Sequence, residues 1–208
     1  MQLRRKQTKA KFPWNKGKLM GQKSPLTPQE IWAIRIRLQD RGKHRDLALF
    51  NLAIDSKLRA SDLIRIRVAD VAKNGKSFSR ATTTQNKTSR PAQFEITERT
   101  RKSIERWIVV ADLVSSDYLF KSRQRASPHL SLRQYARLLE SWVVDIGLDP
   151  ASYGTHSMRR TKATLIYRRT KNLRAVQLLL GHSKLDSTVR YLGVEIDDAL
   201  EISEQTDV

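Results

Sequence analysis

The 208-residue sequence contains no cysteine, so disulfide bridges, a thiolate nucleophile and thiolate metal ligands are all excluded. It also has no apolar run long enough to span a membrane, which requires about 20 residues. The basic N-terminus is not followed by an apolar stretch and a small-residue cleavage site, as a secretory signal would be. We therefore expect a cytoplasmic protein with access to the nucleoid.

Acidic residues are scarce: 21 Asp and Glu stand against 40 Lys and Arg, which gives a formal net charge of +19. This excess is larger than solubility requires and indicates a polyanionic partner, of which double-stranded DNA is the main candidate. An anionic membrane surface is the alternative, but no basic amphipathic segment stands out. The apolar residues, 39% of the chain, suffice for one core, and the length predicts one large domain, with or without an arm.

The charge is distributed unevenly along the chain. We expect residues 1–26 to form a flexible basic arm, either a solvated tail or a segment that wraps around DNA and contacts phosphates. The candidate DNA contacts in this arm are Arg4, Arg5, Lys6, Lys9, Lys11, Lys16 and Lys18. Residues 193–208 contain six acids and no base, and predict either a frayed terminus or an acidic helix over 196–202 that docks on a neighbouring molecule.

Local patterns between these ends predict a mainly helical fold with one small antiparallel sheet, an α+β domain over residues 27–192. Thr27, Pro28 and Glu30 form a helix start, with Thr at the N-cap and Glu three residues later. Further helices are predicted over 46–54, 62–67 (capped by Ser61), 97–111, 132–146, 160–170 and 173–180. The β-rich runs 77–83 and 91–96 flank residues 84–90, which predicts a hairpin.

Four side chains near the end of the expected domain indicate a chemical function. His156 and Arg159 lie three residues apart at the start of a predicted helix, so both project from the same face. His182 follows Gly181, which fits the position just past a helix end, and Tyr191 comes nine residues later. In a chain this basic, a guanidinium, two imidazoles and a phenol suggest chemistry on a phosphodiester.

The order of these residues resembles the tyrosine recombinase, or phage integrase, family. That family's pattern is an early Arg, a Lys in a β-hairpin, an H-x-x-R motif, a later His or Trp, and a nucleophilic Tyr. Arg59 matches the early Arg, and Lys87, in the turn over 84–90, matches the hairpin Lys. The resemblance runs from residue 27 to residue 192 and includes Asp62, where the family usually has Glu. It implies the catalytic set Arg59, Lys87, His156, Arg159, His182 and Tyr191.

The resemblance implies that Tyr191 attacks the phosphodiester and forms a 3′-phosphotyrosyl bond. Two Arg forks would hold the non-bridging oxygens, the histidines would contact the phosphate or handle the phenol proton, and Lys87 would protonate the leaving 5′ oxygen. Lys76 and Arg90 are the alternatives to Lys87, and Arg90 and Arg160 are further candidate DNA contacts. The covalent bond stores the energy of the cut strand, so no cofactor is expected. No H-E-x-x-H motif or acidic cluster accompanies the histidines, so no metal is expected either.

The implied function is site-specific DNA recombination: integration, excision or inversion of a mobile element. In the family, four protomers usually assemble on two DNA sites, and accessory DNA-bending proteins are possible partners. Most members have a helical core-binding domain before the catalytic domain, whereas short members that invert promoter segments lack it. Here the basic arm would replace that half of the clamp. Two alternatives stay open, namely a topoisomerase with the same tyrosine chemistry and a non-catalytic DNA-binding regulator.

Overall fold

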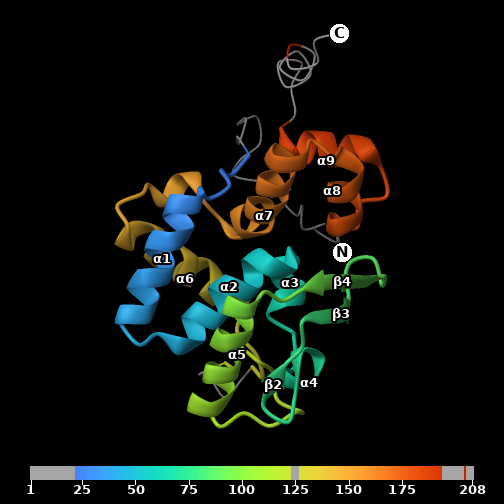
Figure 1. Ribbon diagram of the computed structural model, residues 1–208. Coiled ribbons are helices and arrows are strands. Elements are labelled where there is room, and N and C mark those ends of the chain that lie inside the picture. The colour runs from blue at the N-terminus through green and yellow to red at the C-terminus, as the bar shows by residue number, and fades with distance from the viewer. Residues whose placement is uncertain (1–21, 123–126, 194–203, 205–208) are drawn as a thin grey trace, which may run out of the picture.

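The computed structural model describes residues 22–122, 127–193 and 204 (Figure 1). Helices dominate this part of the chain, and the strands form two small antiparallel sheets of two strands each. The expected class, mainly helical with a small antiparallel sheet, is confirmed, although there are two sheets where one was expected. The seven candidate contacts between Arg4 and Lys18, and the expected helix over 196–202, lie outside the described residues.

The elements follow one another in a mostly helical order. The helices are α1 (Pro28–Asp40), α2 (His44–Ser56), α3 (Ala60–Leu63), α4 (Val68–Val71), α5 (Glu98–Val110), α6 (Leu132–Asp145), α7 (Thr155–Thr170), α8 (Leu173–Leu180) and α9 (Leu185–Leu192), with a 3-10 turn η1 (Pro150–Ser152). The strands are β1 (Ala72–Lys73), β2 (Lys76–Ser77), β3 (Arg80–Thr84) and β4 (Pro91–Glu95). No helix in the described part is long and apolar enough to cross a membrane.

The start of α1 and the hairpin β3–β4 form as the sequence predicts. Thr27 accepts a hydrogen bond from the Glu30 backbone through its hydroxyl, and the Glu30 carboxylate accepts one from the Thr27 backbone at 2.8 Å. Strands β3 and β4 pair from Arg80 opposite Glu95 to Thr84 opposite Pro91. The turn between them contains Lys87, so the expected hairpin lysine is at the turn.

Two predicted helix boundaries were wrong, each for a tertiary or capping reason. The helix expected over 62–67 is α3, which ends at Leu63, because the backbone beyond it pairs elsewhere: Leu119 donates to the Ile66 carbonyl at 2.8 Å. Ser61 consequently lies inside α3 and does not cap it. Helix α7 begins at Thr155, earlier than residue 160, because the Ser157 hydroxyl accepts a hydrogen bond from the Gly154 backbone. His156 therefore lies in the first turn of α7.

The apolar side chains form two separate clusters. The main core surrounds α2, which is buried along most of its length, and includes an edge-on contact between Phe50 and Trp142. A smaller cluster joins α7, α8 and α9 through Ala163, Tyr167, Val176, Leu180 and Leu192, with Tyr191 partly buried against it. Figure 1 shows these three helices together at the top of the molecule, above the hairpin. We call this group the satellite cluster.

Residues 22–26, which we expected to belong to the arm, pack on the folded domain. Leu26 is part of the main core, and its backbone N–H donates to the Thr161 hydroxyl at 3.0 Å. The Ser24 backbone donates to the Ser152 carbonyl, and the Arg160 guanidinium donates to the Lys23 carbonyl. The folded unit thus includes this segment, which lies against α7.

Candidate active site

Arg59 lies at the junction between α2 and α3, where it is the N-cap residue of α3. The chain reaches it through Lys57, which ends α2 in the left-handed conformation with φ 54°. One guanidinium nitrogen, Nη1, donates to Gln85 Oε1 at 2.8 Å. Gln85 is buried and directly precedes the hairpin turn, so Arg59 is linked to the hairpin.

The hairpin turn with Lys87 is held on α3 by backbone and side-chain contacts. Asp62 Oδ1 accepts a hydrogen bond from the Asn86 backbone at 3.0 Å, and Arg65 donates to the Asn86 side chain at 3.2 Å. Lys87 and Arg90 are exposed in this turn. Lys76, which was an alternative to Lys87, belongs to the other sheet, where it pairs with Glu105 at 3.9 Å. The placement of the turn beside Arg59 favours Lys87 or Arg90 over Lys76.

Arg159 is almost completely buried on α7, with 3% of its surface exposed. Its Nη2 atom donates to the Leu180 carbonyl at 2.6 Å, so the side chain is fixed at the C-terminus of α8. Burial lowers the pKa of Arg159, whereas the nearby Tyr191 acts in the opposite direction. A guanidinium has five N–H donors, so this bond leaves others available for an oxyanion.

His182 directly follows Gly181, which ends α8 in the left-handed conformation, as the sequence predicts. Its Nδ1 atom lies 3.1 Å from the Thr188 hydroxyl on α9. Burial lowers the pKa of His182 to about 4, with the positive charges of Arg159 and Arg59 adding to the effect. The imidazole is therefore neutral at physiological pH.

Tyr191, the expected nucleophile, lies on α9 beside His182. The two rings meet edge-on, with centroids 5.4 Å apart and planes at 85°. Its hydroxyl is buried and faces the Arg159 guanidinium, although no donor or acceptor among the described residues meets it with good hydrogen-bond geometry. Burial raises the pKa of Tyr191 to about 12, although the positive charges of Arg159 and Arg160 oppose this increase. The phenol is thus protonated and lies in a strongly positive environment.

The structure groups four of the six predicted catalytic residues. The positive charges of Arg59 and Arg159 lower the pKa of His182 and oppose the rise in the pKa of Tyr191, and the His182 and Tyr191 rings are in contact. The four side chains come from the α2–α3 junction, α7, the end of α8 and α9. His156 and Lys87 are exposed, and neither side chain makes a hydrogen bond or ion pair within residues 22–122 and 127–193. In the same ranges, no three His, Asp or Glu side chains are placed to hold a metal ion.

Arg160 occupies a different environment from the one expected of a DNA contact. Only 8% of its surface is exposed, its Nη1 atom donates to the Lys23 carbonyl at 2.6 Å, and its guanidinium carbon lies 5.7 Å from the centre of the Tyr191 ring. The bond to Lys23 thus holds a side chain that lies beside the Tyr191 ring. Arg160 therefore contributes positive charge beside Tyr191, and its contact with DNA stays a prediction.

Sequence reasoning missed the polar side chains that hold these groups in place. Gln85 bonds Arg59, Thr188 bonds His182, and the buried Gln177 donates to the His182 carbonyl at 3.1 Å. Glutamine and threonine are common, and nothing in the local pattern distinguishes these three. Only the folded arrangement identifies them.

Comparison with known proteins places this site in a family. The family model described as "Phage integrase family" matches residues 25–196. The "Probable integrase/recombinase YoeC" of Bacillus subtilis (strain 168) is 31% identical over 169 residues, which cover 81% of this chain and 88% of that protein. The chain belongs to the phage integrase family. The expected membership of the tyrosine recombinases is therefore confirmed.

Other members and solved structures agree with this assignment. A tyrosine recombinase XerC of Neisseria gonorrhoeae (strain ATCC 700825 / FA 1090) is 30% identical over 154 residues, which cover 74% of this chain but 48% of the relative. The crystal structure of XerA recombinase superposes with a TM-score of 0.71 at 18% identity, covering 87% of this chain and 64% of XerA. XerH recombinase bound to its difH substrate, a pre-cleavage complex, gives 0.69 at 18% identity, covering 86% and 53%. These structures have the same fold as the described domain.

Proposed function

We propose that this protein is a site-specific DNA recombinase that cleaves and rejoins strands through Tyr191. The observation that supports this most directly is the grouping of Arg59, Arg159 and His182 around a buried phenol in a phage integrase fold. YoeC is named as a probable integrase/recombinase, and XerH is a recombinase captured on DNA before cleavage. Both are consistent with phosphodiester chemistry at the same place in this chain.

In the proposed reaction, Arg59 and Arg159 bind the non-bridging oxygens of the scissile phosphate. Each guanidinium is oriented by one bond to the protein, from Arg59 to Gln85 and from Arg159 to the Leu180 carbonyl. Other N–H groups of these two side chains would meet the charge that develops on the oxygens as Tyr191 attacks. Donors fixed in advance stabilise such a transition state more than solvent does, because they need no reorganisation.

Bond formation between Tyr191 Oη and phosphorus requires loss of the phenol proton. The neutral His182 ring beside Tyr191 can accept that proton or donate a hydrogen bond to the phosphate. As the bond to the 5′ oxygen breaks, Lys87 would donate a proton to that oxygen from the hairpin turn. The reverse sequence, with a 5′ hydroxyl attacking the phosphotyrosyl bond, reseals a strand without a nucleotide cofactor.

The proposal extends to the partners of the whole protein. Double-stranded DNA is the substrate, and the basic residues of the first 21 positions add contacts to phosphates. Four protomers would act on two DNA sites, with accessory DNA-bending proteins, in integration, excision or inversion. A nucleoid-associated location follows from this substrate. The chain spans about half the length of the XerC relative it matches.

Covalent trapping tests the proposal directly. Protein is incubated with a supercoiled plasmid library of genomic fragments, the reaction is stopped with detergent, and protein–DNA adducts are collected and sequenced. We expect an adduct with the wild type and none with Tyr191→Phe. No hydrogen bond of good geometry holds the Tyr191 hydroxyl within the described ranges, so its removal should leave the fold intact. Tyr167→Phe, at a buried tyrosine of the same satellite cluster, is the matched control and should retain the adduct.

Other outcomes would replace the proposal with one of the alternatives. Retardation of DNA in a gel without any adduct would indicate a DNA-binding regulator. Adducts spread over unrelated sequences, together with relaxation of the plasmid, would indicate a topoisomerase. An adduct that persists in Tyr191→Phe would assign the nucleophile to another residue.

A further inference from the structure

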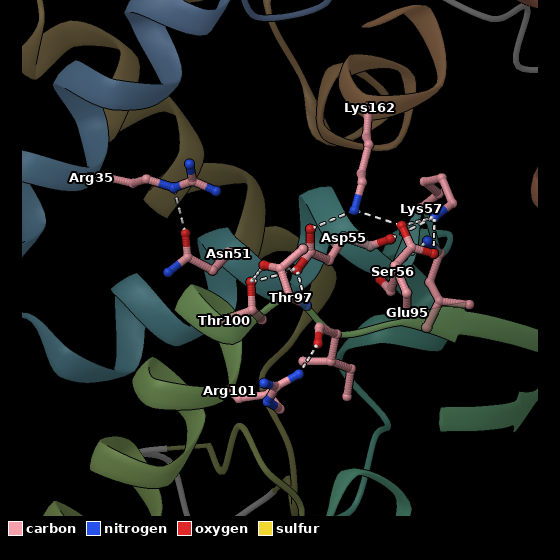
Figure 2. Close-up of polar contacts among 12 residues, drawn as sticks. Arg35, Asn51, Asp55, Ser56, Lys57, Glu95, Thr97, Thr100, Arg101 and Lys162 are labelled. Atoms are coloured by element: carbon pink, nitrogen blue, oxygen red, sulfur yellow. Dashed lines mark hydrogen bonds and ion pairs between the residues drawn. The ribbon is translucent and has the colours of Figure 1, made fainter. Parts of the chain in front are cut away.

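Four charged side chains meet where the end of α2, strand β4 and helix α7 come together. They are Asp55 near the end of α2, Lys57 directly after α2, Glu95 at the end of β4 and Lys162 on α7 (Figure 2). Lys162 Nζ lies 2.8 Å from Asp55 Oδ1 and 2.6 Å from Glu95 Oε1. Lys57 Nζ lies 3.0 Å from both carboxylate oxygens of Glu95 and donates to the Asp55 carbonyl at 2.7 Å. We call this group the four-residue network.

Three members of the four-residue network are largely removed from solvent, and its charges balance. The Lys57 side chain is 0% exposed, that of Asp55 is 4% exposed and that of Lys162 is 19% exposed, whereas Glu95, at 37%, lies at the solvent edge. Burial opposes ionisation of Asp55, yet hydrogen bonds from Lys162 and Thr100 hold the pKa of Asp55 below its ordinary value. Two lysines of a strongly basic chain are thus satisfied by protein acceptors. A buried charge without such a partner would be costly, so the three buried members depend on their partners in the network.

The second oxygen of Asp55 extends the four-residue network to α5. Asp55 Oδ2 accepts hydrogen bonds from the Thr97 backbone at 2.9 Å, the Thr97 hydroxyl at 2.7 Å and the Thr100 hydroxyl at 2.6 Å. Thr97 is the N-cap residue of α5, so the same carboxylate that bonds α7 also fixes where α5 begins. Figure 2 shows Lys162 pointing from α7 toward Asp55 and Glu95.

Three of the elements joined by the four-residue network, the end of α2, the hairpin and α7, also hold or adjoin one of the proposed catalytic cations. Lys57 lies two residues before Arg59, and Lys162 lies three residues after Arg159, about one turn further along α7. Glu95 lies opposite Arg80 in the register of β3 and β4, at the open end of the hairpin whose turn contains Lys87. These three elements are distant in sequence, and the ion pairs of the four-residue network connect all of them.

We propose that Asp55, Lys57, Glu95 and Lys162 are positioning residues that set Arg159 in register with Arg59 and with the hairpin of Lys87. This inference rests on the proposed function of the site. The four side chains do not contact the phosphate; they fix the elements from which the contacting groups project. Replacement of a buried ion pair by apolar residues is often tolerated for stability, so geometry is the property that the four-residue network is expected to control. A displacement of one ångström at a catalytic group is enough to slow a reaction about 100-fold.

The first test compares Lys162→Met, Lys162→Arg and Arg41→Met in the adduct assay on the plasmid library. Lys162→Met keeps the methylene chain and removes the charge, and we expect adduct formation to slow about 100-fold at equal amounts of bound DNA. Lys162→Arg keeps a cation in reach of both carboxylates and should recover most of the rate. Arg41→Met removes another ion pair between elements, from Arg41 to Asp145 on α6, and should leave the rate unchanged.

The second test measures how firmly the three elements are held, independently of activity, by amide hydrogen exchange of the same proteins. In Lys162→Met we expect faster exchange over residues 57–63, 80–95 and 155–162, and unchanged exchange over α6. Uniformly faster exchange, or no change in those three segments, would overturn the proposal. So would a loss of adduct that merely follows the folded fraction. If the wild type forms no adduct, the proposed function fails, and exchange still decides whether the four residues position these elements.

A double variant tests whether the four side chains act as one unit. Groups in one network lose their effect together, so Lys162→Met with Glu95→Gln should slow adduct formation no more than Lys162→Met alone. Losses that multiply would mean that Glu95 and Lys162 act separately, which contradicts the proposal.

Discussion

His182 lies between the positive charges that the proposed phosphate site requires, and this has a cost for folding. Burial and the two guanidinium groups of Arg159 and Arg59 keep its imidazole neutral, with a pKa of about 4. The neutral ring is suited to accept a proton from the adjacent Tyr191. Acidification charges this ring in the unfolded chain more readily than in the folded one.

This difference predicts how stability depends on pH. A histidine in the unfolded chain has a pKa of about 6.5, so between that pH and about pH 4 the unfolded state binds the extra proton. His182 therefore lowers the free energy of unfolding progressively as pH falls through this window. Below about pH 4 its contribution no longer changes. We expect His182→Gln to lose less stability than wild type between pH 7 and pH 5, by at most about 1 kcal/mol because the partly exposed ring is screened by solvent.

Urea unfolding at several pH values measures this effect. His156→Gln, which removes an exposed imidazole from α7, is the control for the loss of a histidine. Parallel stability curves for wild type and His182→Gln would contradict the burial of His182 among positive charges.

At the scale of elements, the backbone of Gly181 at the end of α8 lies close to the Gln85 side chain of the hairpin. Gly181 has φ 66°, and a methyl group added there would lie 3.3 Å from the Gln85 amide nitrogen. Gln85 in turn holds Arg59. Gly193 ends α9 with nearly the same conformation, φ 68°, but a methyl group there would meet nothing within 4 Å.

These two glycines form a matched pair. Gly181→Ala and Gly193→Ala should each cost about 1 kcal/mol, because alanine is strained in the left-handed conformation. Only Gly181→Ala should also slow adduct formation, because it displaces Gln85 and with it Arg59. Thermal unfolding and the adduct assay measure the two effects. Equal adduct rates in the two variants would show that Gln85 does not position Arg59.

The sequence predicts those elements whose signals are local. The capping box at Thr27 and the hairpin over 80–95 depend on residues a few positions apart, and both form as predicted. Helix α3 was placed wrongly because pairing between residue 66 and residue 119 ends it, and no local signal contains that contact. Membership of the fold followed from the order of a few chemically distinctive residues.

The four-residue network could not be predicted in the same way. Lys162 and Asp55 are separated by 107 positions, and the chain has 40 Lys and Arg from which a partner would have to be chosen. Charge pairing has no periodicity that marks it in a sequence. The same holds for the bond from Arg59 to Gln85, so the outline of the site was predictable and its supports were not.

At the scale of the whole molecule, the first 26 residues divide into two parts with separable roles. The segment over 22–26 packs on α7 and places Leu26 in the main core. The seven basic residues between Arg4 and Lys18 are proposed to contact phosphates.

Removal of the first part should therefore change DNA binding and not stability, and substitution in the second part should change stability and not DNA binding. Removal of residues 1–21 should leave the unfolding temperature unchanged and reduce the slope of log affinity against log salt by at most about 6, since each phosphate contact contributes about 0.9. Leu26→Ala should cost about 2–4 kcal/mol of stability and leave that slope unchanged. Fluorescence anisotropy with duplex DNA and thermal unfolding measure the two quantities. An unchanged slope after truncation would exclude these seven residues as DNA contacts.

The division of the apolar interior into two clusters has a consequence for heat resistance. Tyr191 rests on the satellite cluster, whose five buried members join only α7, α8 and α9, whereas the main core joins most of the remaining described elements. A cluster this small opens at a lower free energy than the domain as a whole. On warming, Tyr191 should detach from Arg59 and Arg159 while the main core is still folded. Loss of strand cleavage would then precede melting, and cooling would restore it.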